Sequence, residues 1–310
     1  MKTRTILWAM SIALLVALPP AVMALGQPFY IDLVRRIMIL AIAAVSLNLI
    51  LGYGGLVSFG HAAYLGIGAY AVGILAFYGF TSGWLQWAVA VAASALVALA
   101  IGAVSIRTSG VYFIMITLAF TQMLYYLGIS LEEFGGDDGM RLRAKSQFSG
   151  LIDLRDPVAF YYLALVLMLL SVFLVYRIVN SRFGMALRAA KSNEARARAI
   201  GFSPYPYRLA AFVMAGAMCG LAGALYANHT NYIVPGLMSW QQSGDIMFMV
   251  ILGGMASTAG PVLGTFALLF VEELLKGWTE HWQVILGPLL VLSVIFFRRG
   301  LAGMFYKPDA

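Results

Sequence analysis

Few residues in this chain have the types and spacing that catalysis or metal binding requires. The 310 residues include one cysteine, Cys219, and three scattered histidines, without the spacing of metal ligands. Neither a Walker-type phosphate loop nor a nucleophile elbow is present. Asp245, Glu272 and Glu273 sit near the ends of hydrophobic blocks, so they are weak candidates for a proton- or sodium-coupled pump. We therefore expect no catalytic, cofactor or metal site, and energy for the protein's work must come from elsewhere.

The remaining candidates are polar residues and flexible glycines inside hydrophobic segments. One group surrounds a glycine-rich stretch that should unwind a helix, and the other lies on a single later helix. The residues that could line a solute path are Asn48, Gly54, Gly55, Ser58, His61, Thr117, Thr121 and Gln122. Broken helices at membrane depth often bind or pass solute. A packing hinge and hydrogen bonds between helices explain the same residues equally well, and His61 fits a packing residue better than a proton carrier.

A short basic segment separates two long uncharged blocks. Seven of the twenty Lys and Arg residues lie within 177–208, where Glu194 is the only acid. This density is typical of a cytoplasmic loop in a membrane protein. Residues 186–200 are rich in helix formers, Asn193 can divide them into two short helices, and Gly201 should end the second. Such a segment either docks a soluble partner or lies on lipid, and the residues themselves favour neither.

The elements that position these residues are membrane helices. The chain is 62% hydrophobic and 11% charged, whereas soluble domains have about 25% charged residues. No charged residue occurs between Arg36 and Arg107, a stretch far too long for one spanning helix of roughly 20 residues. We expect an all-α, polytopic protein with a single transmembrane domain over 1–310. Its net charge of +7 reflects bases at the membrane flanks, where they meet anionic lipid, and does not indicate nucleic acid.

The distribution of bases predicts a topology. The hydrophobic block at 244–275 is long, and a glycine-rich run at 253–261 interrupts it. With the N-terminal bases in the cytoplasm and the first helix uncleaved, the final Arg298-Arg299 pair falls inside only if this block forms two short helices. We therefore predict about ten crossings, with the basic loop inside.

One long polar loop, 131–157, falls on the outer face with six acids against four bases. A second outer segment, 229–245, is polar and aromatic. Together they form either a docking surface for an external binding protein or a solvated connector, with equal support from the sequence. The residues proposed for docking are Glu132, Glu133, Asp137, Asp138 and Arg141. Arg35 and Arg36 also fall at an outer end, against the positive-inside rule.

Several segments together resemble one family. Asn193-Glu194-Ala195, followed six residues later by Gly201, resembles the Glu-Ala-Ala coupling loop of ABC importer permeases, although Arg196 stands where the second Ala is expected. The segments that are similar to signatures of branched-chain amino acid permeases are 47–70, 110–120 and 135–140. The resemblance covers nearly the whole chain and is greatest to the LivM-type half of the LivH/LivM-type family.

The resemblance implies the permease subunit of an ATP-driven importer in the bacterial inner membrane, working by alternating access. Its partners would be a homologous permease in a heterodimer, two cytoplasmic ATP-binding subunits and an extracytoplasmic solute-binding protein. Its substrate would be leucine, isoleucine or valine, or a related amino acid, urea or amide. The residues implied to contact the ATPase are Arg188, Asn193, Glu194, Ala195, Ala199 and Gly201. The alternative is a stand-alone secondary transporter or passive channel for a small polar solute.

Overall fold

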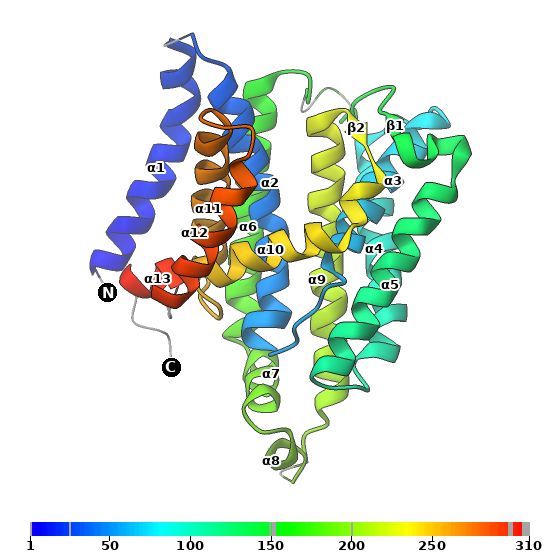
Figure 1. Cartoon of the computed structure of the whole chain (residues 1–310), viewed down its shortest axis with the longest axis vertical. Helices are drawn as coiled ribbons and strands as arrows, with labels where there is room; N and C mark the ends of the chain where they lie inside the picture. The colour runs from blue at the N-terminus through cyan, green and yellow to red at the C-terminus, as the bar shows by residue number, and fades with distance from the viewer. Residues whose placement is uncertain are drawn as a thin grey trace.

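The computed structural model describes residues 2–24, 26–148, 150, 153–199, 201–296 and 300–305. Most of them are helical and very few are in strands (Figure 1), so the predicted all-α fold is confirmed. The longer helices are α1 (Lys2–Ala24), α2 (Phe29–Asn48), α3 (His61–Phe77), α4 (Gly83–Ser105), α5 (Val111–Ser130), α6 (Pro157–Val179), α9 (Pro204–Thr230), α10 (Trp240–Gly253), α11 (Gly260–Lys276) and α12 (Trp282–Phe296). The shorter elements are α7 (Arg182–Ser192), α8 (Glu194–Ala199), α13 (Gly300–Phe305), the π-helical turn η1 (Leu49–Tyr53), the 3-10 turns η2 (Glu132–Phe134), η3 (Gly136–Asp138) and η4 (Pro235–Met238), and the strands β1 (Met140–Arg141) and β2 (Tyr232–Ile233).

Helix α2 is the centre of the bundle. Its most apolar stretch, which continues through η1, is 94% buried, whereas those of α4 and α5 are 33% and 22% buried. After its first two turns α2 is apolar on all sides, as suits a helix surrounded by others, and it packs against α6, α9, α10 and α11. α4 and α5 expose broad apolar surfaces, which suit contact with lipid or with another subunit.

Helix α9 lies close to α3 and α4 because glycines face both of them. A Cβ on Gly220 would overlap the Ser94 hydroxyl of α4, and a Cβ on Gly223 would overlap the Leu65 carbonyl oxygen of α3. Small residues let membrane helices approach each other closely, and here they pack helices of the same chain.

Helix α1 runs through the Pro19–Pro20 pair without ending. A proline has no N–H, so the carbonyl group four residues before each proline has no partner within the helix. Those carbonyls are at Leu15 and Val16, and they accept hydrogen bonds from the hydroxyl groups of Tyr161 at 2.8 Å and Tyr162 at 3.1 Å. Helix α6 thus supplies the donors that the prolines removed, as membrane burial requires.

The block at 244–275 forms two helices, as the glycine-rich run predicts. α10 ends at Gly253, α11 begins at Gly260, and the turn between them contains Gly254 at φ 112°. A residue without a Cβ adopts such a positive φ without strain. α10 has 14 residues, which is about 21 Å at 1.5 Å per residue, so it is shorter than a hydrocarbon core of about 30 Å.

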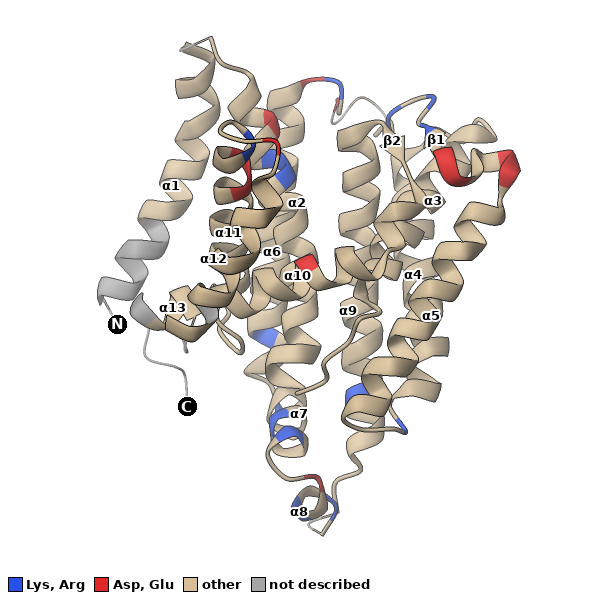
Figure 2. Ribbon diagram, in the orientation of Figure 1, with Lys and Arg blue, Asp and Glu red and all other residues tan. Residues whose placement is uncertain are grey.

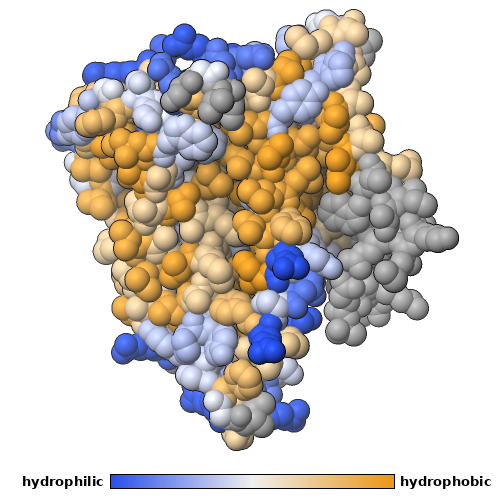
Figure 3. All heavy atoms as spheres, turned by 180° about the vertical axis from the view of Figure 1, so that it is seen from behind, coloured by the Kyte–Doolittle hydropathy of each residue, from blue (hydrophilic) through white to orange (hydrophobic). Residues whose placement is uncertain are grey.

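Charge is separated along the bundle. Figure 2 shows the acids of η2 and η3 at the upper end and the bases of α7 and α8 at the lower end, and Figure 3 shows a broad hydrophobic belt on the rear face. Among the described residues, five helices are long and apolar enough to cross a membrane, and shorter apolar helices accompany them. The chain is therefore a multi-pass membrane protein. Arg298, Arg299 and the side chains of Lys2 and Arg4, which entered the topology, lie outside the described part.

Arg35 and Arg36, the exceptions to the positive-inside rule, are paired within the chain. Arg35 is 5% exposed, forms an ion pair with Asp32 and donates through Nε to Nδ1 of His229 at 2.9 Å. Arg36 lies 3.6 Å from the Glu272 carboxylate. Bases that are neutralised by neighbours give little orienting charge, which explains their position.

The two polar segments at the upper end are joined. β1 pairs antiparallel with β2, with Arg141 opposite Tyr232. The two strands therefore join parts of the segments 131–157 and 229–245, while the last residues of 229–245 belong to α10.

Candidate functional site

The basic loop, residues 177–208, folds into two short helices. Ser181 caps α7, because its hydroxyl accepts a first-turn N–H at 3.4 Å. Asn193 has an extended backbone (φ −160°, ψ 105°) and separates α7 from α8, as predicted. Its side-chain oxygen accepts the Arg196 N–H at 2.9 Å and so starts α8. Gly201 follows at φ 87°, which confirms the predicted helix stop.

Glu194, the only acid of the basic loop, connects α8 to α9. One carboxylate oxygen accepts from Arg198 at 2.5 Å and the other from Arg208 at 2.8 Å. Burial of the carboxyl opposes its ionisation, but the hydrogen bonds and charges of Arg208 and Arg198 outweigh burial, and the pKa of Glu194 is lowered. The tip of the loop is therefore held as one unit.

The first break, residues 54–60, joins α2 to α3. η1 ends at Tyr53, and no regular helix forms until α3 begins. Thr121 on α5 donates to the Phe59 carbonyl oxygen at 3.1 Å, and the Thr117 hydroxyl accepts the Phe59 N–H at 3.3 Å. Backbone groups at membrane depth need such partners because lipid offers none.

Two further buried side chains complete the first break. The Ser58 hydroxyl accepts the Gly60 N–H at 3.1 Å. His61 places Nε2 2.7 Å from the Ser46 hydroxyl and is fully buried. His61 is thus a hydrogen-bonded packing residue at the start of α3.

The second break, residues 254–259, is held by a side chain from another element. Asn48 at the end of α2 accepts the Ala256 N–H at 3.1 Å through Oδ1 and donates to the Ser257 carbonyl oxygen at 2.9 Å through Nδ2. Asn48 is 1% exposed. Gly52 lies against the same turn, where a Cβ would be 2.5 Å from the Ala256 nitrogen. The end of α2 and η1, which lead into the first break, therefore contact the second break.

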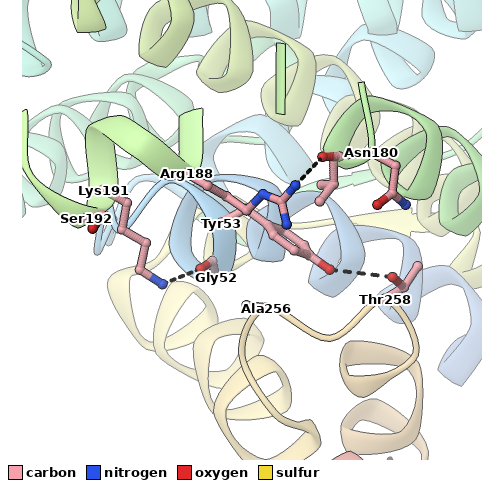
Figure 4. A pocket seen from close by; sticks show the side chains of 9 residues that line it. Gly52, Tyr53, Asn180, Arg188, Lys191, Ser192, Ala256 and Thr258 are labelled. Carbon is pink, nitrogen blue, oxygen red and sulfur yellow. Dashed lines mark hydrogen bonds between the residues drawn. The ribbon is translucent and has the colours of Figure 1, made fainter. Parts of the chain in front are cut away.

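A cavity of about 310 Å³, here called the junction cavity, is lined by η1, the end of α6, α7 and the second break (Figure 4). Lys191 on α7 donates to the Gly52 carbonyl oxygen at 2.5 Å, and Arg188 donates to the Val179 carbonyl oxygen at 3.4 Å. Other lining residues are Tyr53, Asn180, Ser192, Ala256 and Thr258. The Tyr53 and Thr258 hydroxyls lie 3.5 Å apart and join η1 to the second break.

The chemistry available to this arrangement is mechanical coupling. A displacement of α7 would act on Gly52 through the Lys191 ammonium, and a hydrogen bond from a charged group contributes about 1.5–3 kcal/mol. Gly52 lies against Asn48 and Ala256, so the displacement would reach both breaks. Among the described residues, no three metal-ligating side chains come together.

The residues singled out from the sequence lie in three places. Asn48, Ser58, His61, Thr117 and Thr121 are at most 1% exposed and hydrogen-bond inside the chain, Gln122 is half-buried, and Gly54 and Gly55 lie in the first break. Arg188 lines the junction cavity, while Asn193, Glu194, Ala195, Ala199 and Gly201 lie at the tip of the basic loop. Glu132, Glu133, Asp137, Asp138 and Arg141 are exposed at the upper end. For the first set, hydrogen bonding within the bundle fits the geometry better than lining a path.

The sequence does not reveal the contact of Lys191 with Gly52, nor the hydrogen bonds by which Asn48 holds the second break. A base in the last turn of a helix is expected to interact with that helix's own carbonyl groups. Lys191 instead contacts a residue 139 positions earlier, and Asn48 reaches a turn 208 positions later. The chain contains no local pattern from which either contact could be deduced.

An all-helical, multi-pass membrane protein in which a basic helical loop contacts two broken helices has the form of a transport permease. The family described as branched-chain amino acid transport system / permease component matches residues 29–294, and the chain belongs to that family. The high-affinity branched-chain amino acid transport system permease protein LivM of Escherichia coli (strain K12) is 30% identical, over 91% of this chain and 73% of that protein. The protein of the same name from Salmonella typhimurium is 29% identical over the same shares. The probable branched-chain amino acid transport permease protein LivH of Methanocaldococcus jannaschii is 25% identical over 46% of this chain and 47% of that protein. No solved structure matches the chain.

Proposed function

We propose that this chain is the membrane-spanning permease subunit of an ATP-binding cassette importer, which moves branched-chain amino acids or related small solutes by ATP-driven alternating access. The family supports the class of protein, and the relatives named LivM support the substrate. The membrane is then the bacterial inner membrane. The observation that supports this mechanism most directly is the hydrogen bond from Lys191 in the basic loop to Gly52 beside the first break.

The proposal includes three kinds of partner. Similarity to both LivM and LivH proteins supports a heterodimer with a homologous permease. The exposed apolar surface of α5 is broad enough to serve such a contact or to meet lipid. Two cytoplasmic ATP-binding subunits would dock on the basic loop, and an extracytoplasmic solute-binding protein would dock on the acidic turns η2 and η3.

Within the described ranges, five long and three shorter apolar helices, together with α10 and α11 on either side of the second break, support about ten crossings within a single transmembrane domain over 1–310. This topology places the basic loop in the cytoplasm and 131–157 outside. Nucleotide-driven movement of the ATPase would push on Asn193–Gly201, which Glu194 holds together. Lys191 would transmit that movement to the first break, and Asn48 would transmit it to the second.

The test separates coupling from assembly. Lys191→Met removes the ammonium donor and keeps most of the side-chain length, and Arg155→Met is the matched control, because the exposed Arg155 side chain lies away from the basic loop and makes no polar contact within the described residues. We expect both tagged chains to co-purify with a second permease and ATP-binding subunits. In liposomes, Lys191→Met should lower leucine uptake per ATP hydrolysed about tenfold, which corresponds to about 1.4 kcal/mol, while the control stays within about twofold.

Two results would contradict the proposal in different ways. If Lys191→Met transported as much leucine per ATP as the unaltered complex, the coupling route would be wrong. If the chain purified alone and moved solute alone in liposomes, it would be a stand-alone transporter or channel.

A further inference from the structure

Helix α10 leaves one narrow face uncovered, and that face contains an acid. The helix packs on α2, α3 and α11, and its buried side includes Ser243, whose hydroxyl accepts the Ala62 N–H at 3.1 Å. Gln241, Asp245 and Phe248 are exposed. Their spacing of four and three residues puts them on the same side of the helix.

The acid lies far from both ends of the bundle. α10 sits at mid-height, between the acidic turns at the upper end and the basic loop at the lower end (Figures 1 and 2). Asp245 is its only acidic residue and the sixth of its 14 residues, so its expected position at the end of a hydrophobic block is wrong. An ionised carboxylate that faces lipid at a helix centre costs about 2.5–3.5 kcal/mol or more. This face of α10 must therefore meet water or a polar group.

No described side chain pairs with Asp245. Glu272, an acid on the neighbouring helix α11, is paired with Arg36 at 3.6 Å and with Lys276 at 2.5 Å. Asp245 has neither a hydrogen bond nor an ion pair with any residue in the described ranges. Its carboxylate is therefore available to a cation from outside the chain.

The surface beside Asp245 suits a small molecule that is partly apolar. Gly244 precedes it, and a Cβ at Gly244 would meet only the Phe59 ring, at 4.0 Å. Phe59 belongs to the first break and is half-buried, and Phe248 is 40% exposed on the Asp245 face. One anionic group with aromatic rings nearby offers an ionic contact and an apolar contact at the same place.

We propose that Asp245 binds the α-ammonium group of the amino acid during its passage, while Phe59 and Phe248 contact the aliphatic side chain. The proposal rests on the import function above and names the substrate contact within it. An ammonium donates strong, charge-assisted hydrogen bonds to a carboxylate. Gln241, one turn earlier on the same face, has an amide that can donate to the substrate carboxylate. Phe59 links this site to the break that α7 contacts.

The first experiment measures leucine uptake by the co-purified complex in liposomes. Asp245→Asn removes the charge and keeps the shape, and Asp245→Glu restores the charge. Glu280→Gln is the matched control, since Glu280 is an exposed acid in the connection between α11 and α12 without a polar contact in the described residues. We expect at least a tenfold loss of uptake for Asp245→Asn, partial recovery for Asp245→Glu, and no change for Glu280→Gln. Uptake by Asp245→Asn within about twofold of the unaltered complex would overturn the proposal.

The second experiment asks directly whether the position faces a watery path. Cys219 is the only cysteine and is buried, so Cys219→Ser gives a background without reactive thiols. In that background, Asp245→Cys should react with a membrane-impermeant, cationic methanethiosulfonate reagent in at least one nucleotide state. If no nucleotide state allows labelling, position 245 does not face a watery path and the substrate contact is refuted.

Two other outcomes would show whether the substrate contact or the import function is wrong. If Asp245→Asn no longer co-purifies with the second permease, the acid pairs with a base of that subunit and the substrate contact is refuted. If the unaltered complex takes up leucine without ATP, the import function fails, and the effect of Asp245→Asn on that uptake would still test the contact in a carrier.

Discussion

The two helix breaks are both glycine-rich interruptions of membrane helices, but they are held in different ways. The first break forms hydrogen bonds with its own Ser58 and with Thr117 and Thr121 on α5. The second break has a side-chain bond of its own to Ser257, which accepts the Gly260 N–H at 3.2 Å, and its other side-chain partners are Asn48 of α2 and Tyr53 of η1. The first break is therefore stabilised locally, whereas the second is stabilised by the helix that leads into the first.

This difference shows how a loop can influence two distant segments through one contact. Lys191 donates a hydrogen bond to Gly52 of η1, beside the first break, and its side chain lies against Gly55 within that break. A movement there would also reach the second break, because the same end of α2 bonds to two backbone groups of that break. Variants at this end of α2 should disturb the second break, and variants on α5 should leave it intact.

The largest effect is expected for Gly52→Ala. A Cβ there would overlap the Asn48 amide and lie 2.5 Å from the Ala256 nitrogen, so it would separate the two breaks. Overpacking together with the loss of buried hydrogen bonds should cost about 3–5 kcal/mol of unfolding free energy. Thermal unfolding of the purified complex would measure this loss. Gly287→Ala in α12, where a Cβ meets nothing within 4 Å, is the control and should leave the melting temperature unchanged or slightly higher.

Asn48→Ala is expected to have the next largest effect, and it should be confined to one break. The change leaves the Ala256 N–H and the Ser257 carbonyl without partners, which costs about 2–4 kcal/mol. Hydrogen exchange should speed up over 254–259 while the Phe59 amide stays protected. Asn180→Ala, an exposed residue bonded only within its own helix, serves as control. Faster exchange at Phe59 alone would refute the dependence of the second break on α2.

A smaller effect, confined to the first break, is expected for Thr121→Val. This change keeps the shape of the side chain and removes the hydroxyl that donates to the Phe59 carbonyl oxygen, at a cost of about 1 kcal/mol. Exchange should speed up over 54–60 and stay unchanged over 254–259. Thr108→Val, in the connection between α4 and α5, tests the same chemical change away from both breaks. Equal acceleration at both breaks would mean that they unfold together.

The smallest effect is expected for Glu194→Gln, which should leave both breaks unchanged. Partly exposed ion pairs contribute about 1 kcal/mol or less. Because the pKa of Glu194 is lowered in the folded loop, its stabilisation is present above the ordinary value near 4.5 and is lost as the pH falls through the lowered pKa. The difference in melting temperature between the two proteins should be constant from pH 6 to 8 and should disappear in acid. A difference that grows between pH 6 and 8 would contradict the assigned direction of the shift.

The predictable features are those with local signals in the chain. The glycine-rich run at 253–261 identifies the division between α10 and α11, and Asn193 and Gly201 mark the ends of α7 and α8. Helical periodicity, glycine and proline act over a few residues, so the sequence alone contains this information.

The features that could not be predicted depend on where whole helices lie. Asp245 seemed to be near a helix end because hydropathy gives its distance from polar residues along the chain, whereas α10 lies at mid-height of the bundle. Asn48 looked like a residue of the solute path, because nothing nearby reveals a partner 208 positions away. Contacts across such separations depend on the packing of four or more helices around α2.

The hydrogen bonds from two tyrosine hydroxyls of α6 fix how α1 docks on the bundle. Tyr161 and Tyr162 point about 100° apart around α6, and the two acceptor carbonyls are likewise neighbours around α1. Both bonds form together only at one depth and one rotation of α1, a helix that precedes the family match at residue 29. The two prolines therefore specify the docking register of this helix through exposed backbone acceptors, without placing a charged side chain within the bilayer.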